Sequence, residues 1–128
     1  MIVTQRKKFS PADRTANETT ALFDVPKGSR VVWASCRKLR LAEAGSTSTM
    51  TLGDGADPDG FIASAQLDPE TGTIGDLVDG QGAYFVTSGG KLYLVDDKVD
   101  VDYVASGTPG AVAPVVLFQI GVAREWEP

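Results

Sequence analysis

Three aspartates in the segment DGADPDG, Asp54, Asp57 and Asp59, are the residues whose types and spacing first suggest chemistry. Carboxylate oxygens in a glycine-rich loop are the ligands that Ca²⁺ prefers. A helix–loop–helix calcium site would need an acidic first ligand and a late glutamate, but Gly55 and Gln66 stand at those positions. The segment is therefore predicted to be a solvated turn whose aspartates accept hydrogen bonds from their own backbone. A calcium ion bound by this loop is the alternative.

Four more aspartates lie within residues 96–102. The first two, Asp96 and Asp97, form a predicted turn. Asp100 and Asp102 alternate with apolar residues, and this period of two predicts the solvent-facing side of a strand. The glycine pair before Lys91 lacks the rest of a phosphate-binding loop and is predicted to be a hairpin turn.

Histidine is absent from the chain. This absence excludes the Ser-His-Asp and Cys-His machineries and nearly every zinc or iron site. A pair of carboxylates could still exchange protons, but it would need a partly buried cleft to separate the two pKa values. Because the DGADPDG segment is rich in Gly and Pro and the aspartates of residues 96–102 are predicted in a turn and on a solvent-facing strand, we expect no catalytic residue, no cofactor and no bound metal.

The single cysteine, Cys36, permits no disulfide within the chain. It follows the apolar run VVWAS, so it is predicted to be a small buried hydrophobic residue. A bridge between chains, or a reactive thiol, is the alternative.

Aromatic side chains on strands are usually part of the core, but they also form the platforms on which sugars stack. The candidates are Trp33, Tyr84, Phe85 and Tyr93. Tyr84 and Tyr93 alternate with apolar neighbours and are the pair expected to be exposed. They are therefore the candidate glycan contacts.

Charge is distributed unevenly along the chain, whose net charge is −5. Residues 1–40 hold nine basic and three acidic side chains, whereas residues 41–128 hold three basic and fourteen acidic ones. Such a dipolar chain could dock one end on an acidic surface or associate head to tail. We expect instead that the sheets interleave early and late strands and so mix the charges. Nucleic acid is not expected as a partner, because the basic residues lack interleaved aromatics.

The length of 128 residues indicates one domain. No apolar run approaches the roughly 20 residues that span a bilayer, so no membrane association is expected. The N-terminal residues have the wrong order of charge and apolarity for a secretory signal, and synthesis in a cytoplasm is expected.

Short alternating segments separated by turn residues predict an all-β fold. We expect an N-terminal arm at residues 1–19, a β-sandwich domain at 20–123 and a tail at 124–128. Within the arm, Ile2–Phe9 can be an extended segment or an edge strand. Asp68–Gly82 is predicted to be a long polar loop anchored by Ile74, Leu77 and Val78. The other expected strands are Thr20–Val25, Arg30 to about Leu39, Ser48–Gly53, Phe61–Leu67, Ala83–Thr87, Lys91–Val95, Lys98–Val104 and about Val112 to Ala123.

Three of these strands have a predicted core face. On Thr20–Val25, the side chains of Ala21, Phe23 and Val25 share one side. For the strand from Arg30 to about Leu39, a short helix after residue 36 is the competing prediction. The later core faces consist of Val99, Val101, Tyr103, Val116, Phe118, Ile120 and Val122. Eight or nine mostly antiparallel strands at roughly ten-residue spacing predict a β-sandwich or jelly roll.

The segments LFDVPKGSRVV, STMTLGDGADPDGFI and GAYFVTSGGKLYLVDDKVDVDY, followed by an apolar last strand, resemble small structural proteins of tailed bacteriophages. The similarity runs from about Ala21 to Val122, and its most specific parts are GDGADPDGF and GGKLY. The resemblance implies a β-sandwich that binds and stabilises the capsid as a head decoration or cement protein. It also implies a place in the virion and the major capsid protein as partner. A homo-oligomer is expected, with a trimer among the arrangements allowed.

The basic residues Arg6, Lys7 and Lys8, together with Trp126, are the expected capsid contacts. The runner-up function is an attachment module on a tail or head fibre, in which Tyr84 and Tyr93 bind a host glycan. A cupin-like enzyme and a non-viral β-sandwich are the remaining alternatives, and the lack of histidine argues against the former.

Overall fold

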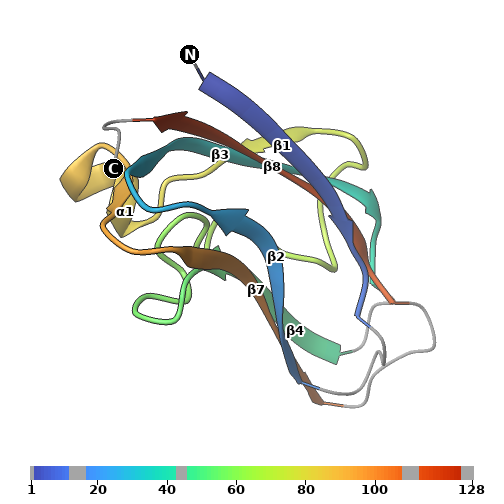
Figure 1. Ribbon diagram of the computed structural model, residues 1–128. Coiled ribbons are helices and arrows are strands. Elements are labelled where there is room, and N and C mark those ends of the chain that lie inside the picture. Colours follow the sequence, from blue (N-terminus) through green and yellow to red (C-terminus); the bar gives the residue numbers. More distant parts are fainter. Residues whose placement is uncertain (1, 12–16, 43–45, 108–112, 125–128) are drawn as a thin grey trace.

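The computed structural model describes residues 2–11, 17–42, 46–107 and 113–124. Its strands form two antiparallel layers, one of five strands and one of three (Figure 1). The larger sheet has the order β1-β8-β3-β5, with β6 also paired to β3, and the smaller has the order β2-β7-β4. The expected all-β fold is confirmed. The elements are β1 (Ile2–Phe9), β2 (Glu18–Val25), β3 (Ser29–Arg40), β4 (Ser46–Gly53), β5 (Leu77–Asp79), α1 (Ala83–Ser88), β6 (Lys91–Tyr93), β7 (Asp97–Gly107) and β8 (Val115–Arg124).

The core lies between the two sheets, and β7 and β8 contribute seven of the twenty buried residues that form it in the described part of the chain. Their predicted inward faces are confirmed. Period-two alternation places one apolar side chain of every two against the opposite sheet. Six of these side chains are completely buried and the seventh is nearly so: Val99, Val101, Tyr103, Val116, Phe118, Ile120 and Val122.

The strand expected from Arg30 to about Leu39 is confirmed as β3, without the competing helix. A β-bulge between Val31 and Trp33 changes which side chains face inward. Val31 is buried, then Trp33 turns outward and Cys36 faces the core. The predicted burial of Cys36 is therefore confirmed, at 1% exposure. A bulge breaks the period of two because two residues of one strand oppose a single residue of the other.

A second bulge, between Ala21 and Phe23 of β2, corrects the face predicted for that strand. Ala21 is exposed, whereas Leu22, Phe23 and Val25 are buried. One side chain expected inside has thus been replaced by its neighbour.

Residues Ile2–Phe9, within the predicted arm at 1–19, adopt the edge-strand alternative and form β1 of the larger sheet. All eight residues of β1 pair with β8, from Ile2 opposite Ala123 to Phe9 opposite Val116. Only Phe9 is buried, and Ile2 and Val3 are about half exposed. The five-stranded sheet therefore begins at the second residue of the chain.

The hairpin expected from Ala83 to Val95 is wrong. Residues Ala83–Ser88 form the six-residue helix α1, and only Lys91–Tyr93 is a strand. Gly89 ends the helix in the left-handed conformation, with φ 63°, and its N–H is bonded to the carbonyl of Phe85. The rings of Tyr84 and Phe85 pack on Phe61, at 5.1 and 5.5 Å between centroids. This packing supports a helix that the strand-forming residue types did not predict.

The strand expected at Phe61–Leu67 is also wrong. A single bridge joins Ile62 to Leu52, and the chain then turns, with the N–H of Gln66 bonded to the carbonyl of Ala63. The apolar residues at both ends, Phe61 and Leu67, are nevertheless completely buried. The apolar side chains of Phe61 and Leu67 were enough to predict their burial, but not the backbone conformation of the segment between them.

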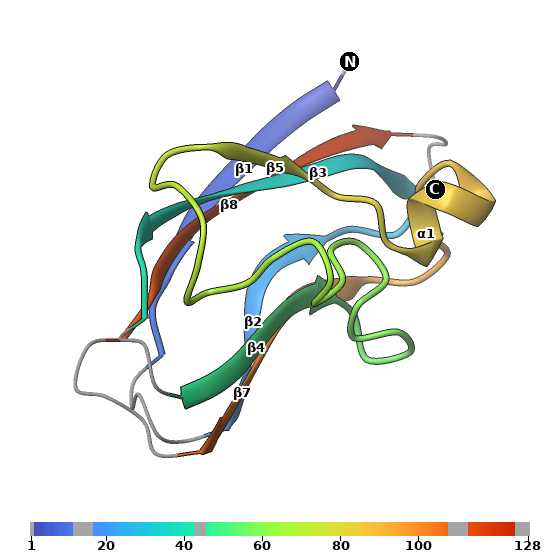
Figure 2. The same ribbon diagram turned by 180° about the vertical axis from the view of Figure 1, so that it is seen from behind.

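The loop at residues 68–82 contains the short strand β5, paired with β3 (Figure 2). Of its three predicted anchors, Ile74 and Leu77 are exposed and only Val78 packs against the core. The loop is instead held by the buried Lys38, whose ammonium group donates hydrogen bonds to the carbonyls of Asp68 and Thr71. Within the described residues, no helix is long and apolar enough to cross a membrane.

Candidate functional site

Charged residues separate between the two sheets, which contradicts the expected mixing. In the described strands of the five-stranded sheet, nine residues are basic and one, Asp79, is acidic. In the three-stranded sheet, five residues are acidic and one, Lys98, is basic. The basic residues are Arg6, Lys7, Lys8, Arg30, Arg37, Lys38, Arg40, Lys91 and Arg124, and the acidic residues of the smaller sheet are Glu18, Asp24, Asp97, Asp100 and Asp102.

The strand order explains this separation. Early and late strands do interleave, since β8 lies between β1 and β3. However, the charged residue of β8 is Arg124, which is also basic. Interleaving therefore adds no negative charge to the larger sheet, while the aspartates of β7 pair with β2 and β4.

The outer side of the larger sheet gathers positive charge around an exposed tryptophan. Residues directly opposite one another on antiparallel strands point to the same side of the sheet. Because Phe118 and Ile120 of β8 face the core, their neighbours on β8 face outward. The cross-strand rows on that side are Lys8–Leu117–Arg37–Leu77, Arg6–Gln119–Ser35–Asp79 and Thr4–Gly121–Trp33. We call the part of this surface formed by Arg6, Lys8, Trp33 and Arg37 the cationic face.

Trp33 lies flat on the sheet at the edge of a shallow hollow. Trp33 is 36% exposed. Its indole lies directly over Gly121, because a Cβ added to that glycine would be only 2.2 Å from the indole Nε1. The ring thus occupies the space above Gly121 that any other residue would fill. The hollow has a volume of about 380 Å³ and is lined by Trp33, Ser35, Arg37, Leu77, Asp79 and Gln119, among others.

The structure places the expected capsid contacts in β1 on different sides of that strand. Arg6 and Lys8 are exposed and belong to the cationic face. Lys7 pairs with the core-facing Phe118, so it points to the other side of β1, where its charge helps to lower the pKa of Asp24. Trp126 lies outside the described residues. Trp33, which the sequence suggested only as a candidate for a sugar platform, and Arg37 were not predicted as capsid contacts. The bulge that turns Trp33 outward leaves no mark in the hydrophobic pattern.

Tyr84 and Tyr93 do not form the exposed platform expected of a glycan site. Tyr93 is buried at 2% exposure, and Tyr84 is partly buried. Their hydroxyl groups donate hydrogen bonds of 2.8 Å to Oδ1 (Tyr84) and Oδ2 (Tyr93) of Asp54. Burial, and then the neighbouring Asp54 carboxylate, raises the pKa of both tyrosines well above the ordinary value of 10. The pair therefore joins α1 and β6 to the 54–59 loop.

Asp54 is the centre of this arrangement rather than part of a solvated turn. Its exposure is 2%, and its Oδ1 also accepts hydrogen bonds from the backbone N–H groups of Ala56 and Asp57, at 3.1 and 2.9 Å. The predicted bonding to its own backbone is thus confirmed, while its predicted exposure to solvent is wrong. A hydrogen bond to the neighbouring Asp59 carboxylate favours the protonated form of Asp57 and raises the pKa of Asp57. Among the described residues, no group of three or more acidic, His or Cys side chains is placed to hold a metal ion.

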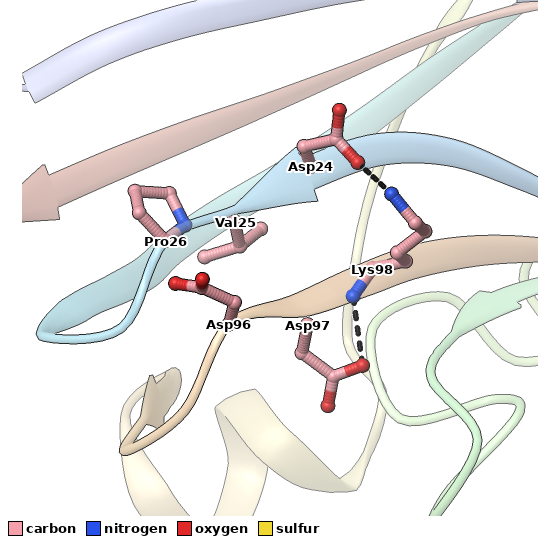
Figure 3. Close-up of a pocket in the computed structure, with 6 residues that line it drawn as sticks. All are labelled: Asp24, Val25, Pro26, Asp96, Asp97 and Lys98. Carbon is pink, nitrogen blue, oxygen red and sulfur yellow. Dashed lines mark hydrogen bonds and ion pairs between the residues drawn. The ribbon is translucent and has the colours of Figure 1, made fainter.

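A second hollow, of about 400 Å³, lies at the end of the smaller sheet (Figure 3). Lys98 forms an ion pair with Asp24, and its backbone N–H donates a 2.7 Å hydrogen bond to Asp97. The turn predicted at Asp96 and Asp97 lies two residues earlier, because the chain bends at Leu94 and Val95 and Asp97 already begins β7. The backbone N–H of Lys27 donates a 2.9 Å hydrogen bond to the Asp96 carboxylate. The ion pair lowers the pKa of Asp24 and raises that of Lys98. These contacts are those of a surface ion pair and a turn, and they place no nucleophile beside a base.

The fold is similar to that of chains in three solved phage capsid structures. A chain of the cyanophage Pam1 capsid asymmetric unit has a TM-score of 0.67 and 11% identity, covering 94% of this chain and 83% of that chain. A chain of the capsid of Ralstonia phage GP4 has a TM-score of 0.65 and 12% identity, covering 99% of this chain and 86% of that chain. A chain of the acidic stable capsid of Helicobacter pylori bacteriophage KHP30 has a TM-score of 0.63 and 13% identity, covering 96% of this chain and 88% of that chain. The expected likeness to phage structural proteins is confirmed in the fold. No protein-family model and no curated protein matches the sequence.

Proposed function

We propose that this protein is a structural component of a bacteriophage virion that decorates and stabilises the capsid. The observation that carries the proposal is the fold, which matches chains of three phage capsid structures over 94%, 99% and 96% of this chain. A decoration protein needs a rigid domain and a surface that binds the capsid shell, and it needs no active site. Two antiparallel sheets with a continuous core supply the rigid body.

The partner that we propose is the major capsid protein. Arg6, Lys7, Lys8 and Trp126 are the contacts that we proposed from the sequence, and the outward placement of Arg6 and Lys8 supports their part in it. Homo-oligomers, with a trimer as one arrangement, would let one decoration unit contact several copies of a symmetric lattice. In this proposal the protein is synthesised in the cytoplasm of the bacterial host and ends in the virion.

Co-sedimentation with purified capsid particles that lack the protein tests this function. We expect the full chain to pellet with the particles to a saturating stoichiometry and to raise the temperature at which they break. A chain that stays in the supernatant at micromolar concentrations, with native circular dichroism, would refute the proposal.

Deletion of residues 1–9 is not a clean test of the basic contacts, because it removes a complete edge strand and the buried Phe9. Point substitutions of the exposed basic side chains leave the β1–β8 ladder in place. The gene order offers an independent check, since a capsid or portal gene beside this one is expected.

A further inference from the structure

We propose that the cationic face is the surface that docks on the capsid, on an acidic patch of the shell protein, with Trp33 as its central anchor. This inference rests on the proposed function and adds to it the face, the orientation and the residues of contact. It follows from four features of the described residues: an exposed and fixed indole, the cations around it, the polar groups beside it and the opposite charge of the other sheet.

Trp33 has the properties of an interface anchor. Large aromatic residues are usually covered, and tryptophan is enriched among the residues that carry most of a binding energy. Trp33 is 36% exposed although its strand lies in the interior of the sheet, between β8 and β5. The indole rests on the backbone at Gly121, so it is held in place before any partner arrives. An anchor fixed in advance loses little side-chain entropy on binding.

The charges around Trp33 fit carboxylates. Arg6, Lys8 and Arg37 are exposed on the same side of the sheet, and they come from two strands that flank β8. Guanidinium groups bind carboxylates through two parallel hydrogen bonds, which makes arginine the preferred cation at interfaces. Leu117 and Leu77 lie in the same row as Lys8 and Arg37 and add apolar area.

The hollow beside Trp33 supplies the polar groups that orient a partner. Asp79 and Gln119 line it together with Ser35. These side chains offer both donors and acceptors of hydrogen bonds, which set the register of an interface more than its affinity. A backbone or side chain of the shell that enters the hollow would meet the exposed edge of the indole.

The opposite charge of the two sheets would orient the molecule as it approaches. Asp100 and Asp102 lie on the outer side of the smaller sheet, since they alternate with the buried Val99 and Val101. Partial burial, and then the nearby Asp97 and Asp54, raises the pKa of Asp100. An acidic shell would repel this side and attract the cationic face, so electrostatic steering would favour a single orientation.

An acidic protein surface fits these observations better than nucleic acid or a second copy of the chain. Within the described residues Trp33 is the one exposed aromatic, so the basic side chains lack the interleaved aromatics on which nucleic-acid bases would stack. On the smaller sheet, four of the five acidic groups already have partners. Asp24 pairs with Lys98, Asp97 accepts from the N–H of Lys98, and Glu18 and Asp102 accept hydrogen bonds from threonine hydroxyls. A second copy would therefore offer the cationic face fewer free carboxylates.

The test measures the affinity of the full chain for stripped capsid particles by co-sedimentation. We expect Trp33→Ala to weaken binding about tenfold or more and Trp33→Phe to weaken it less, as for an aromatic anchor. The double charge reversal Arg6→Glu/Arg37→Glu should weaken binding further and flatten its dependence on salt between about 50 and 300 mM. Lys27→Glu is the control, because Lys27 is an exposed cation in the β2–β3 turn, outside the cationic face. It should bind like the wild type.

The outcomes separate this inference from the proposed function. If the wild type does not bind particles, the proposed function falls and the docking face falls with it. If the wild type binds and the Trp33 and Arg variants bind equally well while remaining folded by circular dichroism, the docking face is overturned and the proposed function stands. Loss of self-association in these variants, measured by analytical ultracentrifugation without loss of particle binding, would overturn it in favour of a second copy. Retention of nucleic acid by the cationic face would also overturn it.

Discussion

Asp54 shows how one side chain joins segments that are far apart in the sequence. A buried carboxylate is tolerated only where hydrogen bonds replace water, and Asp54 receives them from two tyrosine hydroxyls and two backbone N–H groups. The aromatic pair that the sequence suggested for sugar binding is therefore committed to the interior. Nothing in the residue types distinguished a tyrosine whose hydroxyl reaches a carboxylate from one that faces solvent.

The first prediction concerns Tyr93→Phe and alkaline pH. At neutral pH we expect a loss of about 1–3 kcal/mol in unfolding free energy, because the substitution removes the hydroxyl that bonds Asp54 Oδ2. The pKa of Tyr93 is raised in the folded protein, so its contribution is complete below pH 10 and is lost as the pH rises above that value. Denaturant unfolding at about pH 8 and about pH 11 should therefore show a smaller difference between wild type and variant at the higher pH. An unchanged difference would contradict this account.

The second prediction concerns the contact between Trp33 and Gly121. Gly121→Ala would place a methyl group 2.2 Å from the indole Nε1, so the ring must move. We expect a stability loss of about 1–3 kcal/mol and weaker binding to particles, similar to that of Trp33→Ala. In the Trp33→Ala background, Gly121→Ala should cost almost nothing, because the indole that it displaces is gone. A double-mutant cycle of unfolding free energies measures this coupling, and additive costs would show that the ring does not rest on Gly121.

At the scale of elements, β7 and β8 were predicted well, whereas α1 and the bulges in β2 and β3 were not. Alternation in β7 and β8 is a local property, because each residue's side of the sheet follows from its position in the strand. A bulge depends on how a partner strand pairs, and α1 depends on the rings that pack on Phe61. Both are decided by contacts between residues distant in sequence, and no local pattern records them.

The third prediction concerns the loop that carries β5. Lys38 is buried at 7% exposure and donates to two loop carbonyls, while its own carbonyl accepts from the N–H of Gly75 at 2.9 Å. Lys38→Met retains much of the apolar stem and removes both side-chain bonds. We expect hydrogen exchange at Gly75 and in β5 to become about tenfold faster or more, with little change in β7. Lys8→Met, at an exposed position, is the control, and equal acceleration in both variants would contradict the role of Lys38.

At the scale of the whole molecule, Cys36 reports on the joint opening of the two sheets. The thiol is 1% exposed in the core, and burial raises its pKa to about 12, although Lys38 acts in the opposite direction. The reactive thiolate is therefore scarce in the folded protein. The fourth prediction is that thiol-specific labelling follows global unfolding, so the free energy derived from labelling rates should equal that from denaturant unfolding. Labelling that is fast in native buffer would show local opening of β3 instead.

The separation of charge also belongs to this scale, and it is the feature on which the docking proposal depends. The uneven charge along the chain was visible in the sequence, but its fate in space depended on the strand order. Sheets that mix early and late strands usually mix their charges as well. Here β8, inserted between β1 and β3, brings one arginine and no carboxylate.

The alternation of apolar residues was enough to predict the all-β class, the inward faces of β7 and β8 and the burial of Cys36. These features depend on each residue's own type and on its near neighbours, which a sequence displays directly. The outward turn of Trp33, the enclosure of Asp54 by Tyr84 and Tyr93 and the two oppositely charged sheets required the folded arrangement. They arise where distant strands meet, and the pairing of those strands is selected by the energy of the complete core rather than by any one segment.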